Sequence, residues 1–374
     1  MTKGKADLRL LHLADVHLGA SFPWLGERGA AHRRRLRQTF SDAVQRALDD
    51  GVHLALIAGD LFATSHPHPD LSEFVAAQFG RLTATGTEVV IAAGEADALD
   101  AHGAYAGGAF DGLAGVTVLP AAPKVVDFPQ HGLAVCGRSM ARGARDITDP
   151  FKGLSAGRQP FSVALVSLEV ARAGWREALT RAVAGSRFAY LALGGSHKMQ
   201  EAGSEVVPAW FPGSLELLAR SEGPGAALRV DLGGESPIVV PVPLARGRVQ
   251  RMTLEPAAFD TAEALVAEIE AAADADLSLE VRLAGRARPA QFIDTVQVER
   301  RLAPRFFSLE IIDEAMPDLA ALVQPTDRTI TVRGKFAELM NQQLQQAGSE
   351  VERRRIGRAY RLGLWLLQQR REVV

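Results

Sequence analysis

The residues best suited to chemistry in this 374-residue chain are carboxylates and imidazoles that directly follow short apolar runs. Asp15 and His17 end the run LLHLADVH, and in an extended backbone side chains two positions apart point to the same face. Asp60 follows LALIAG, Glu95 follows VVIAAG and His197 follows YLALGGS. Mixed oxygen and nitrogen ligands suit Mn, Fe or Zn, and open α/β sheets build their sites from successive strand ends. The spacing therefore predicts a metal centre at one edge of a sheet.

The apolar runs that carry these residues alternate with segments of helical periodicity. The all-apolar run 54–58 is typical of a strand that is buried on both faces. After residue 213 the pattern changes to a hairpin, with Gly233 and Gly234 at its turn. The alternation predicts a layered α/β sandwich with a mixed sheet. The predicted strands are 8–14, 54–58, 89–93, 116–119, 133–136, 163–166, 190–193, 227–232 and 238–242, and the predicted helices are 31–50 and 71–82.

Length and composition limit the class of protein. A chain of this length predicts two or three domains. The net charge of −2 gives no overall attraction to nucleic acid, so a polyanion site must be a local patch. The single cysteine, Cys136, excludes an intrachain disulfide framework and fits a reducing compartment. No run approaches the ~18 apolar residues of a membrane span, and no secretory signal is recognisable at the start. We therefore expect a cytoplasmic protein that does not use a membrane.

The pattern changes twice more along the chain, which predicts domains at 1–247, 248–330 and 331–374. The second segment combines a predicted helix at 261–273 with strands at 277–283 and 306–312. Residues 254–281 carry acidic and no basic side chains, which argues against DNA phosphates on that face.

The third segment, 335–371, has two apolar helical stripes separated by Gly348 and Ser349. Its arginines are either solvated on a hairpin that packs on its own domain, or they dock a partner or phosphates, and the pattern leaves both interpretations open. These arginines are Arg353, Arg354, Arg355, Arg358 and Arg361.

The ordered motifs resemble those of the calcineurin-like metallophosphoesterases. They are D-x-H at 15–17, GDLF at 59–62, G-x-x-D at 94–97 and G-x-x-H-K at 194–198. Their surroundings, together with FPGS at 211–214, are similar to the DNA-repair exonuclease branch, which includes the SbcD nuclease subunit. The resemblance implies an α/β fold: a four-layer-type metallophosphoesterase β-sandwich flanked by helices, a small α+β capping domain and C-terminal helices.

The resemblance also implies which residues bind metal. In the family, one of two ions is held by the residues that match Asp15, His17, Asp60 and His197, and all four are present here. The implied ion is Mn²⁺. The four residues have a simpler interpretation as a hydrogen-bonded polar cluster without metal, but their recurrence at four separate strand ends favours a metal site.

The set for the second ion is largely replaced. Glu95 stands where the family has an asparagine ligand, and Ser167 and Gly195 stand where it has histidines. Ala96 stands at the family's catalytic histidine, so no catalytic residue is predicted. Only Asp60 remains, with Glu95 as a substitute oxygen ligand, and we expect one Mn²⁺ to be retained and the second to be lost.

Two functions of different classes are compatible with this pattern. One is a metal-dependent phosphodiesterase or DNA exonuclease of SbcD-like type with weak activity. The other is an inactive pseudo-nuclease that acts as a scaffold for DNA or for the coiled coil of an SbcC-like ATPase. The resemblance also implies a homodimer.

His66, His68 and His102 are candidates for relocated metal ligands.

Overall fold

The structure is a computed structural model. It describes residues 8–369 apart from 107–109, 111, 144–148, 169, 171–172, 203–206, 221, 235, 289–290 and 318–330. The chain divides into two compact units, Met1–Arg246 and Gly247–Val374. Arg371, at the expected end of the last helix, lies outside the described residues.

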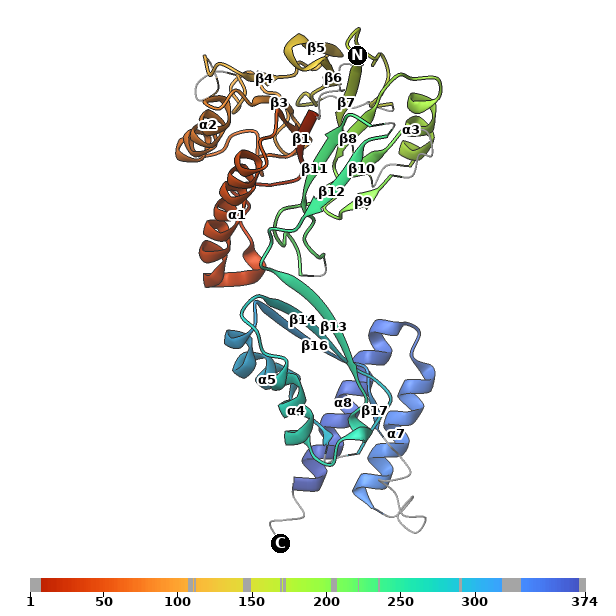
Figure 1. The fold of residues 1–374 in the computed structure, drawn as a ribbon. Coiled ribbons are helices and arrows are strands. Elements are labelled where there is room, and N and C mark those ends of the chain that lie inside the picture. The colour runs from red at the N-terminus through yellow and green to blue at the C-terminus, as the bar shows by residue number, and fades with distance from the viewer. Residues whose placement is uncertain are drawn as a thin grey trace. The chain divides into compact units, whose positions relative to one another are not determined.

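The first unit contains two mixed six-stranded sheets (Figure 1). The first sheet has the order β12-β11-β1-β2-β3-β4, in which β1 to β4 run parallel and β11 runs antiparallel to β1. The second has the order β5-β6-β7-β8-β10-β9. The strands are β1 (Leu8–Leu13), β2 (Leu54–Ala58), β3 (Glu88–Ala92), β4 (Val116–Val118), β5 (Lys124–Phe128), β6 (Leu133–Arg138), β7 (Phe161–Ser167), β8 (Tyr190–Gly194), β9 (Gln200–Glu201), β10 (Ala209–Phe211), β11 (Ala227–Leu232) and β12 (Ile238–Val242).

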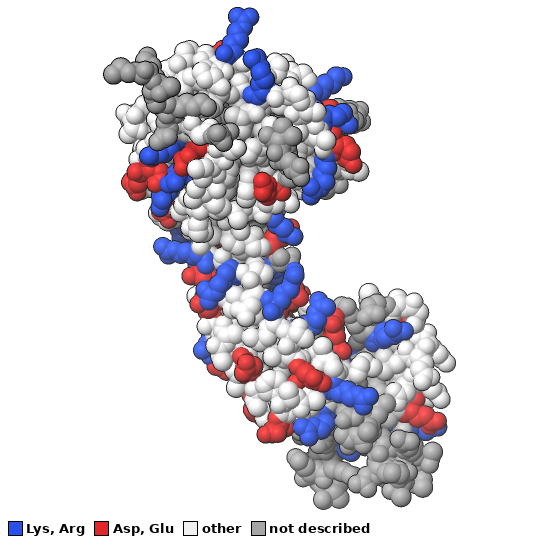
Figure 2. Space-filling view, turned by 45° about the vertical axis from the view of Figure 1, so that its right-hand side comes forward, with Lys and Arg blue, Asp and Glu red and all other residues white. Residues whose placement is uncertain are grey.

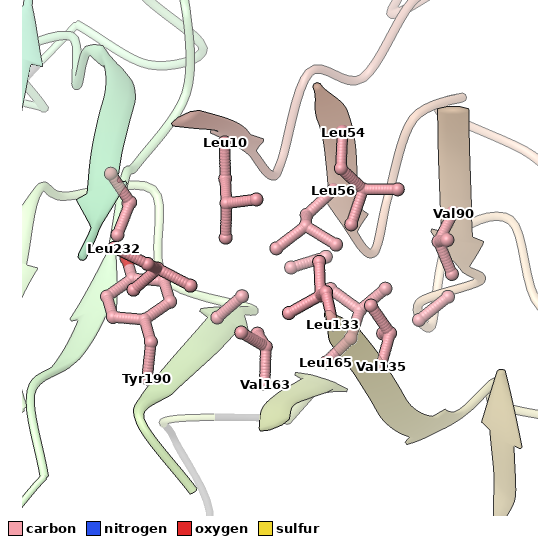
Figure 3. Close-up of a cluster of buried hydrophobic side chains, with 14 of the residues drawn as sticks. Leu10, Leu54, Leu56, Val90, Leu133, Val135, Val163, Leu165, Tyr190 and Leu232 are labelled. Carbon is pink, nitrogen blue, oxygen red and sulfur yellow. The ribbon is translucent and has the colours of Figure 1, made fainter. Parts of the chain in front are cut away.

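The two sheets pack face to face, and alternate residues of their central strands fill the space between them (Figure 3). Leu54 and Leu56 of β2 point into this core from one sheet, and Val163 and Leu165 of β7 point into it from the other. The intervening residues of these strands are also buried. Both strands therefore read as continuous apolar runs, as expected for strands covered on both faces.

Helices cover the outer faces of the sheets. Ala178 and Leu179 of α3 (Trp175–Val183) pack with Ala164 and Val166, the alternate residues of β7. In Figure 1, α1 (Gly29–Asp49) and α2 (Pro69–Thr83) lie beside the first sheet. The result is the layered α/β sandwich that the alternation of strands and helices predicts. Two 3-10 turns lie at Pro23–Arg28 and Pro129–His131.

The second unit contains a three-stranded sheet of order β13-β14-β16. All of its strand pairs are parallel, and a helix connects each strand to the next. Parallel neighbours require crossover connections, and the helices between the strands provide them, so strands and helices alternate along this unit. Its elements are β13 (Arg248–Leu254), α4 (Ala262–Ala271), β14 (Leu277–Leu283), β15 (Arg286–Ala287), α5 (Thr295–Leu302), β16 (Ser308–Asp313) and β17 (Met316–Pro317), with 3-10 turns at Pro256–Ala258 and Ala303–Arg305.

The helical hairpin of α7 (Val332–Gln346) and α8 (Glu350–Gln369) belongs to the same unit. Phe336 of α7 meets Tyr360 of α8 edge to face, with ring centroids 5.9 Å apart. Arg361 of α8 is buried, pairs with Asp313 at 2.8 Å and donates to the carbonyl oxygen of Ala315. Arg361 is therefore a structural residue, which neither interpretation of the arginines anticipated.

Among the helices that the structure describes, none combines the length and the apolar character that crossing a membrane requires.

Candidate metal centre

Three predicted ligands converge at the carboxyl ends of β1 and β8. One donor atom from each of Asp15, His17 and His197 lies within 4.8 Å of the others. Oδ2 of Asp60, which follows β2, is 3.7 Å from Nε2 of His17. The four side chains come from three strands and both sheets, so the packing of one sheet on the other assembles the cluster.

The backbone at three of these residues adopts an unusual conformation. Asp15, His17 and Asp60 have φ of 51°, 50° and 49°, and Phe22 is the other non-glycine residue with positive φ in the described part of the chain. Left-handed backbone is uncommon outside glycine and costs of order 1–3 kcal/mol where the surroundings enforce it. Such strain concentrates at functional sites, and here it coincides with the predicted ligands.

Main-chain hydrogen bonds between the two loops maintain this conformation. The N–H of Asp15 donates to the carbonyl oxygen of Gly59 at 3.1 Å, and the N–H of His17 donates to the carbonyl oxygen of Asp60 at 2.9 Å. The pairing of β1 with β2 therefore continues past the ends of the strands. It holds the two carboxylates and the imidazole in one register.

Burial dominates the electrostatics of the carboxylates. It raises the pKa of Asp15 to about 6, against the opposing effect of the hydrogen bond from the N–H of Gly195. Burial, together with the nearby carboxylates of Asp97 and Asp15, raises the pKa of Asp60 to about 8. Buried like charges disfavour ionisation of one another, and a cation placed among them would remove that penalty.

The imidazole of His17 is suited to such a cation. Burial lowers its pKa to about 4, which keeps the ring neutral as a metal ligand must be. Its Nε2 is buried and has no hydrogen-bond partner among the residues that the structure describes. A buried nitrogen lone pair without a partner beside two carboxylates and a second imidazole fits a divalent ion that accepts nitrogen and oxygen ligands.

His197 is oriented by a residue that sequence reasoning missed. Its Nδ1 lies 3.0 Å from Oε2 of Glu222, in the loop between β10 and β11. Glu222 is 25 positions along the chain and carries no recognisable motif, so only the fold reveals the pair. With Nδ1 engaged, Nε2 is the nitrogen of His197 that remains available to a metal.

Asp97, the last residue of the G-x-x-D motif, has a structural role. It is fully buried and accepts hydrogen bonds from the N–H groups of Gly94 and Phe62, at 2.7 and 3.2 Å. The hydroxyl of Tyr105 donates to it at 2.6 Å. Asp97 thereby ties the loop after β3 to the loop that carries Asp60.

The residues at the positions that the resemblance assigns to the second ion differ from the family's ligands. The side chain of Glu95 is exposed and lies outside the cluster of Asp15, His17 and His197. The N–H of Ala96 donates to Oδ1 of Asp60 at 2.8 Å. A Cβ on Gly195 would overlap the carbonyl oxygen of Leu168, so the fold there requires glycine.

Ser167, at the end of β7, fills the remaining position of that set. A Cβ on Gly59 would overlap its side chain, so the loop before Asp60 passes directly against it. This close packing leaves little room for a larger side chain at 167.

The candidate relocated histidines are directed elsewhere. Nε2 of His66 lies 3.5 Å from Asp100, and Nδ1 of His68 lies 3.6 Å from Asp70. Neither they nor His102 join the metal-ligand cluster found among the described residues.

Comparison with known proteins finds sequence similarity to a DNA-repair protein. The chain is 30% identical over 267 residues to the DNA double-strand break repair protein Mre11 of Aeropyrum pernix, covering 66% of this chain and 63% of that protein. The chain thus matches less than two thirds of that relative's length. A crystal structure of a Vps29 double mutant from Entamoeba histolytica covers 63% of this chain and 98% of its own, with 15% identity and a TM-score of 0.29. No family model matches the chain. The ordered motifs and the sequence similarity to Mre11 together support a place for the chain among the calcineurin-like metallophosphoesterases.

Proposed function

We propose that this protein is a metallophosphoesterase of the DNA-repair exonuclease, SbcD-like type, which hydrolyses phosphodiesters on DNA with one metal site retained. The observation that carries the proposal is the convergence of Asp15, His17 and His197, with Asp60 3.7 Å from His17. We take Mn²⁺ as the ion, because the family resemblance implies it and it is one of the ions that mixed carboxylate and imidazole ligands suit. The similarity to Mre11 supports DNA as the substrate.

The chain's own residues would divide the work at this site. Asp15, His17, Asp60 and His197 would hold the ion, which supplies Lewis-acid polarisation of a phosphoryl oxygen and a nucleophile at neutral pH. The loops after β1 and β2 keep three ligands in fixed register through the bonds between their main chains. Asp97 holds the loop after β3 against Phe62 and so fixes the wall beside Asp60.

We expect the activity to be weak. Two-metal phosphoesterases clamp both the attacking and the leaving oxygen between ions ~3.5–4 Å apart. Ser167 and Gly195 supply no imidazole to a second ion, and Ala96 supplies no proton to a leaving oxygen. A positioned general acid typically contributes about 10²–10⁴ in rate, so its absence alone is a large loss.

The test is hydrolysis of a simple phosphodiester by the purified chain in millimolar Mn²⁺. Asp60→Ala should abolish turnover, and Asp70→Ala, which removes an exposed carboxylate of α2, should leave it unchanged. Equal rates in the wild type and Asp60→Ala would contradict a working site.

A second function is favoured by the same missing ligands: an inactive pseudo-nuclease that acts as a scaffold. Its partners would be DNA or an SbcC-like ATPase coiled coil, in a cytoplasmic homodimer. The exposed residues Arg353, Arg355, Arg358, Leu362 and Leu366 of α8 offer basic and apolar side chains for such a partner. In this scheme residues 248–330 form the capping domain and 331–374 the docking segment.

The distribution of charged side chains is relevant to DNA as a partner in this second function. Basic and acidic side chains are interspersed over the face that Figure 2 shows. DNA would then have to bind at a local basic patch, and several phosphate contacts there would make the binding constant fall steeply as the salt concentration rises. A titration of DNA binding against salt measures this slope. Binding that does not respond to salt would leave only the protein partner.

A further inference from the structure

The segment between β10 and β11 wraps closely around His197. The N–H of Ser214 donates to the carbonyl of His197 at 3.1 Å. Gly213 has φ of 75°, and a Cβ on it would lie 2.7 Å from the carbonyl oxygen of His197. The FPGS sequence therefore allows the chain to turn directly against the backbone of this one residue.

Main-chain hydrogen bonds also hold the end of the same segment in place. The N–H of Gly225 donates to the carbonyl oxygen of Ser214 at 2.6 Å, and the N–H of Ala226 donates to the carbonyl oxygen of Pro212 at 3.0 Å. A Cβ on Gly225 would overlap the carbonyl oxygen of Pro212, so this closure also needs glycine. The loop that these bonds close contains Glu222, whose Oε2 reaches Nδ1 of His197 at 3.0 Å.

The pair contributes little by its own energy. The side chains of His197 and Glu222 are 39% and 34% exposed, and exposed ion pairs contribute a median near zero. Its effect is geometric: a carboxylate on Nδ1 fixes the ring orientation and the tautomer, and leaves Nε2 for the ion. Metal-ligating histidines commonly have such a partner, and its loss costs roughly 10–100-fold in metal affinity.

From this geometry we infer that Glu222 is a positioning residue that sets the metal affinity of the centre through His197, and that the FPGS turn exists to place it. The inference rests on the proposed metal centre. It adds a residue to that centre that touches neither the ion nor the substrate.

Calorimetric titration of the full chain with Mn²⁺ tests it, with three variants beside the wild type. Glu222→Ala removes the carboxylate, and Glu222→Gln keeps an oxygen acceptor for Nδ1–H. Glu201→Ala removes an exposed carboxylate of β9 and is the matched control. Thermal unfolding of each metal-free protein checks the fold, and the visible spectrum with Co²⁺ reports ligand geometry.

We expect Glu222→Ala to weaken Mn²⁺ binding roughly 10–100-fold, with an unchanged metal-free melting temperature and an altered Co²⁺ spectrum. Glu222→Gln should lie between it and the wild type, and Glu201→Ala should match the wild type. Wild-type affinity and spectrum in Glu222→Ala would overturn the inference while leaving the metal centre intact. If Glu222→Ala does not fold, Glu222→Gln is the deciding variant. Wild-type affinity in Glu222→Gln would then overturn the inference that the carboxylate of Glu222 sets the metal affinity. No binding by the wild type would overturn the centre itself, and the inference with it.

Discussion

The N–H of Gly195 donates to both carboxylate oxygens of Asp15, at 3.1 and 3.0 Å. The family resemblance puts an imidazole ligand of the second ion at position 195, where this chain has a glycine and therefore no side chain. The main-chain N–H of that position, which any residue except proline would also have, makes the contact with Asp15. The donor is directed at a residue of the retained set. Position 195 thus supports Asp15 through its main chain, although it offers no ligand of its own.

The glycine at 195 should not be replaceable. Gly195 combines φ of 97° with a Cβ position that overlaps the carbonyl of Leu168. Gly185 has φ of 68° with open space around it, so Gly185→Ala isolates the backbone cost. We expect Gly185→Ala to lower the free energy of unfolding by about 1 kcal/mol and Gly195→Ala by about 2–5 kcal/mol, since steric overlap adds to the strain.

Urea denaturation of both variants measures the difference. Gly195→His should be at least as unstable as Gly195→Ala, so restoring the missing ligand would need changes in the backbone of 168. Equal costs at 195 and 185 would contradict the steric argument.

A bound ion should stabilise the native protein through His17. A ligand at 100 times its dissociation constant that binds only the native state adds about 2.7 kcal/mol to the free energy of unfolding. We expect Mn²⁺ to raise the melting temperature of the wild type. In His17→Ala most of this increase in melting temperature should be absent. His68→Ala changes an imidazole that is exposed on its loop, and it should retain the full shift. A shift retained in His17→Ala would place the ion elsewhere.

His12 should make the protein sensitive to acid. It is fully buried in β1, with Nδ1 2.9 Å from the hydroxyl of Tyr190, and burial lowers its pKa to about 3. The unfolded chain binds a proton at His12 below about pH 6.5, and the native state does not until about pH 3. The stability linked to His12 is therefore present above pH 6.5 and is lost as the pH falls from 6.5 toward 3.

Comparing His12→Gln with the wild type by urea denaturation from pH 7.5 to 4 isolates this effect. Below pH 6.5 the free energy of unfolding of the wild type should fall by up to about 1.4 kcal/mol per pH unit more than that of the variant. His68→Gln should follow the wild type. Parallel curves for His12→Gln and wild type would show that His12 does not cause the acid sensitivity.

Arg361 should be important for the stability of the second unit. It is 7% exposed and pairs with Asp313, whose pKa burial raises. Removing one partner of a buried pair leaves an uncompensated charge and costs about 3–5 kcal/mol. We expect Arg361→Ala to lower the free energy of unfolding by that amount, and Arg358→Ala, one turn earlier and exposed, to change it by less than about 0.5 kcal/mol.

Denaturation followed by circular dichroism measures both variants. In a double variant Arg361→Met with Asp313→Leu, most of the loss should be recovered, because neither buried charge remains. If Arg361→Ala and Arg358→Ala changed the free energy of unfolding equally, Arg361 would not be a structural residue.

The sequence by itself determined the order of the motifs and nine of the twelve strands described in the first unit, and it missed β5, β9 and β10. Runs such as Leu54–Ala58 are apolar at every position because both faces of the sheet are covered, and that requirement is visible locally. A polar residue directly after such a run must emerge at the edge of the sheet. Asp15, Asp60 and His197 could therefore be proposed as neighbours before any contact between them was known.

Only the tertiary structure decided which distant groups meet. Glu222 reaches His197 because glycines close the loop that carries it, and no periodicity or motif marks that approach. Arg361 is buried because Asp313 lies under α8, and its sequence environment is the same as that of the exposed arginines beside it. The parallel pairing of β13, β14 and β16 likewise follows from how α4 and α5 cross over, which composition does not record. Local patterns report the burial of a segment, whereas the identity of its partner depends on the path of the whole chain.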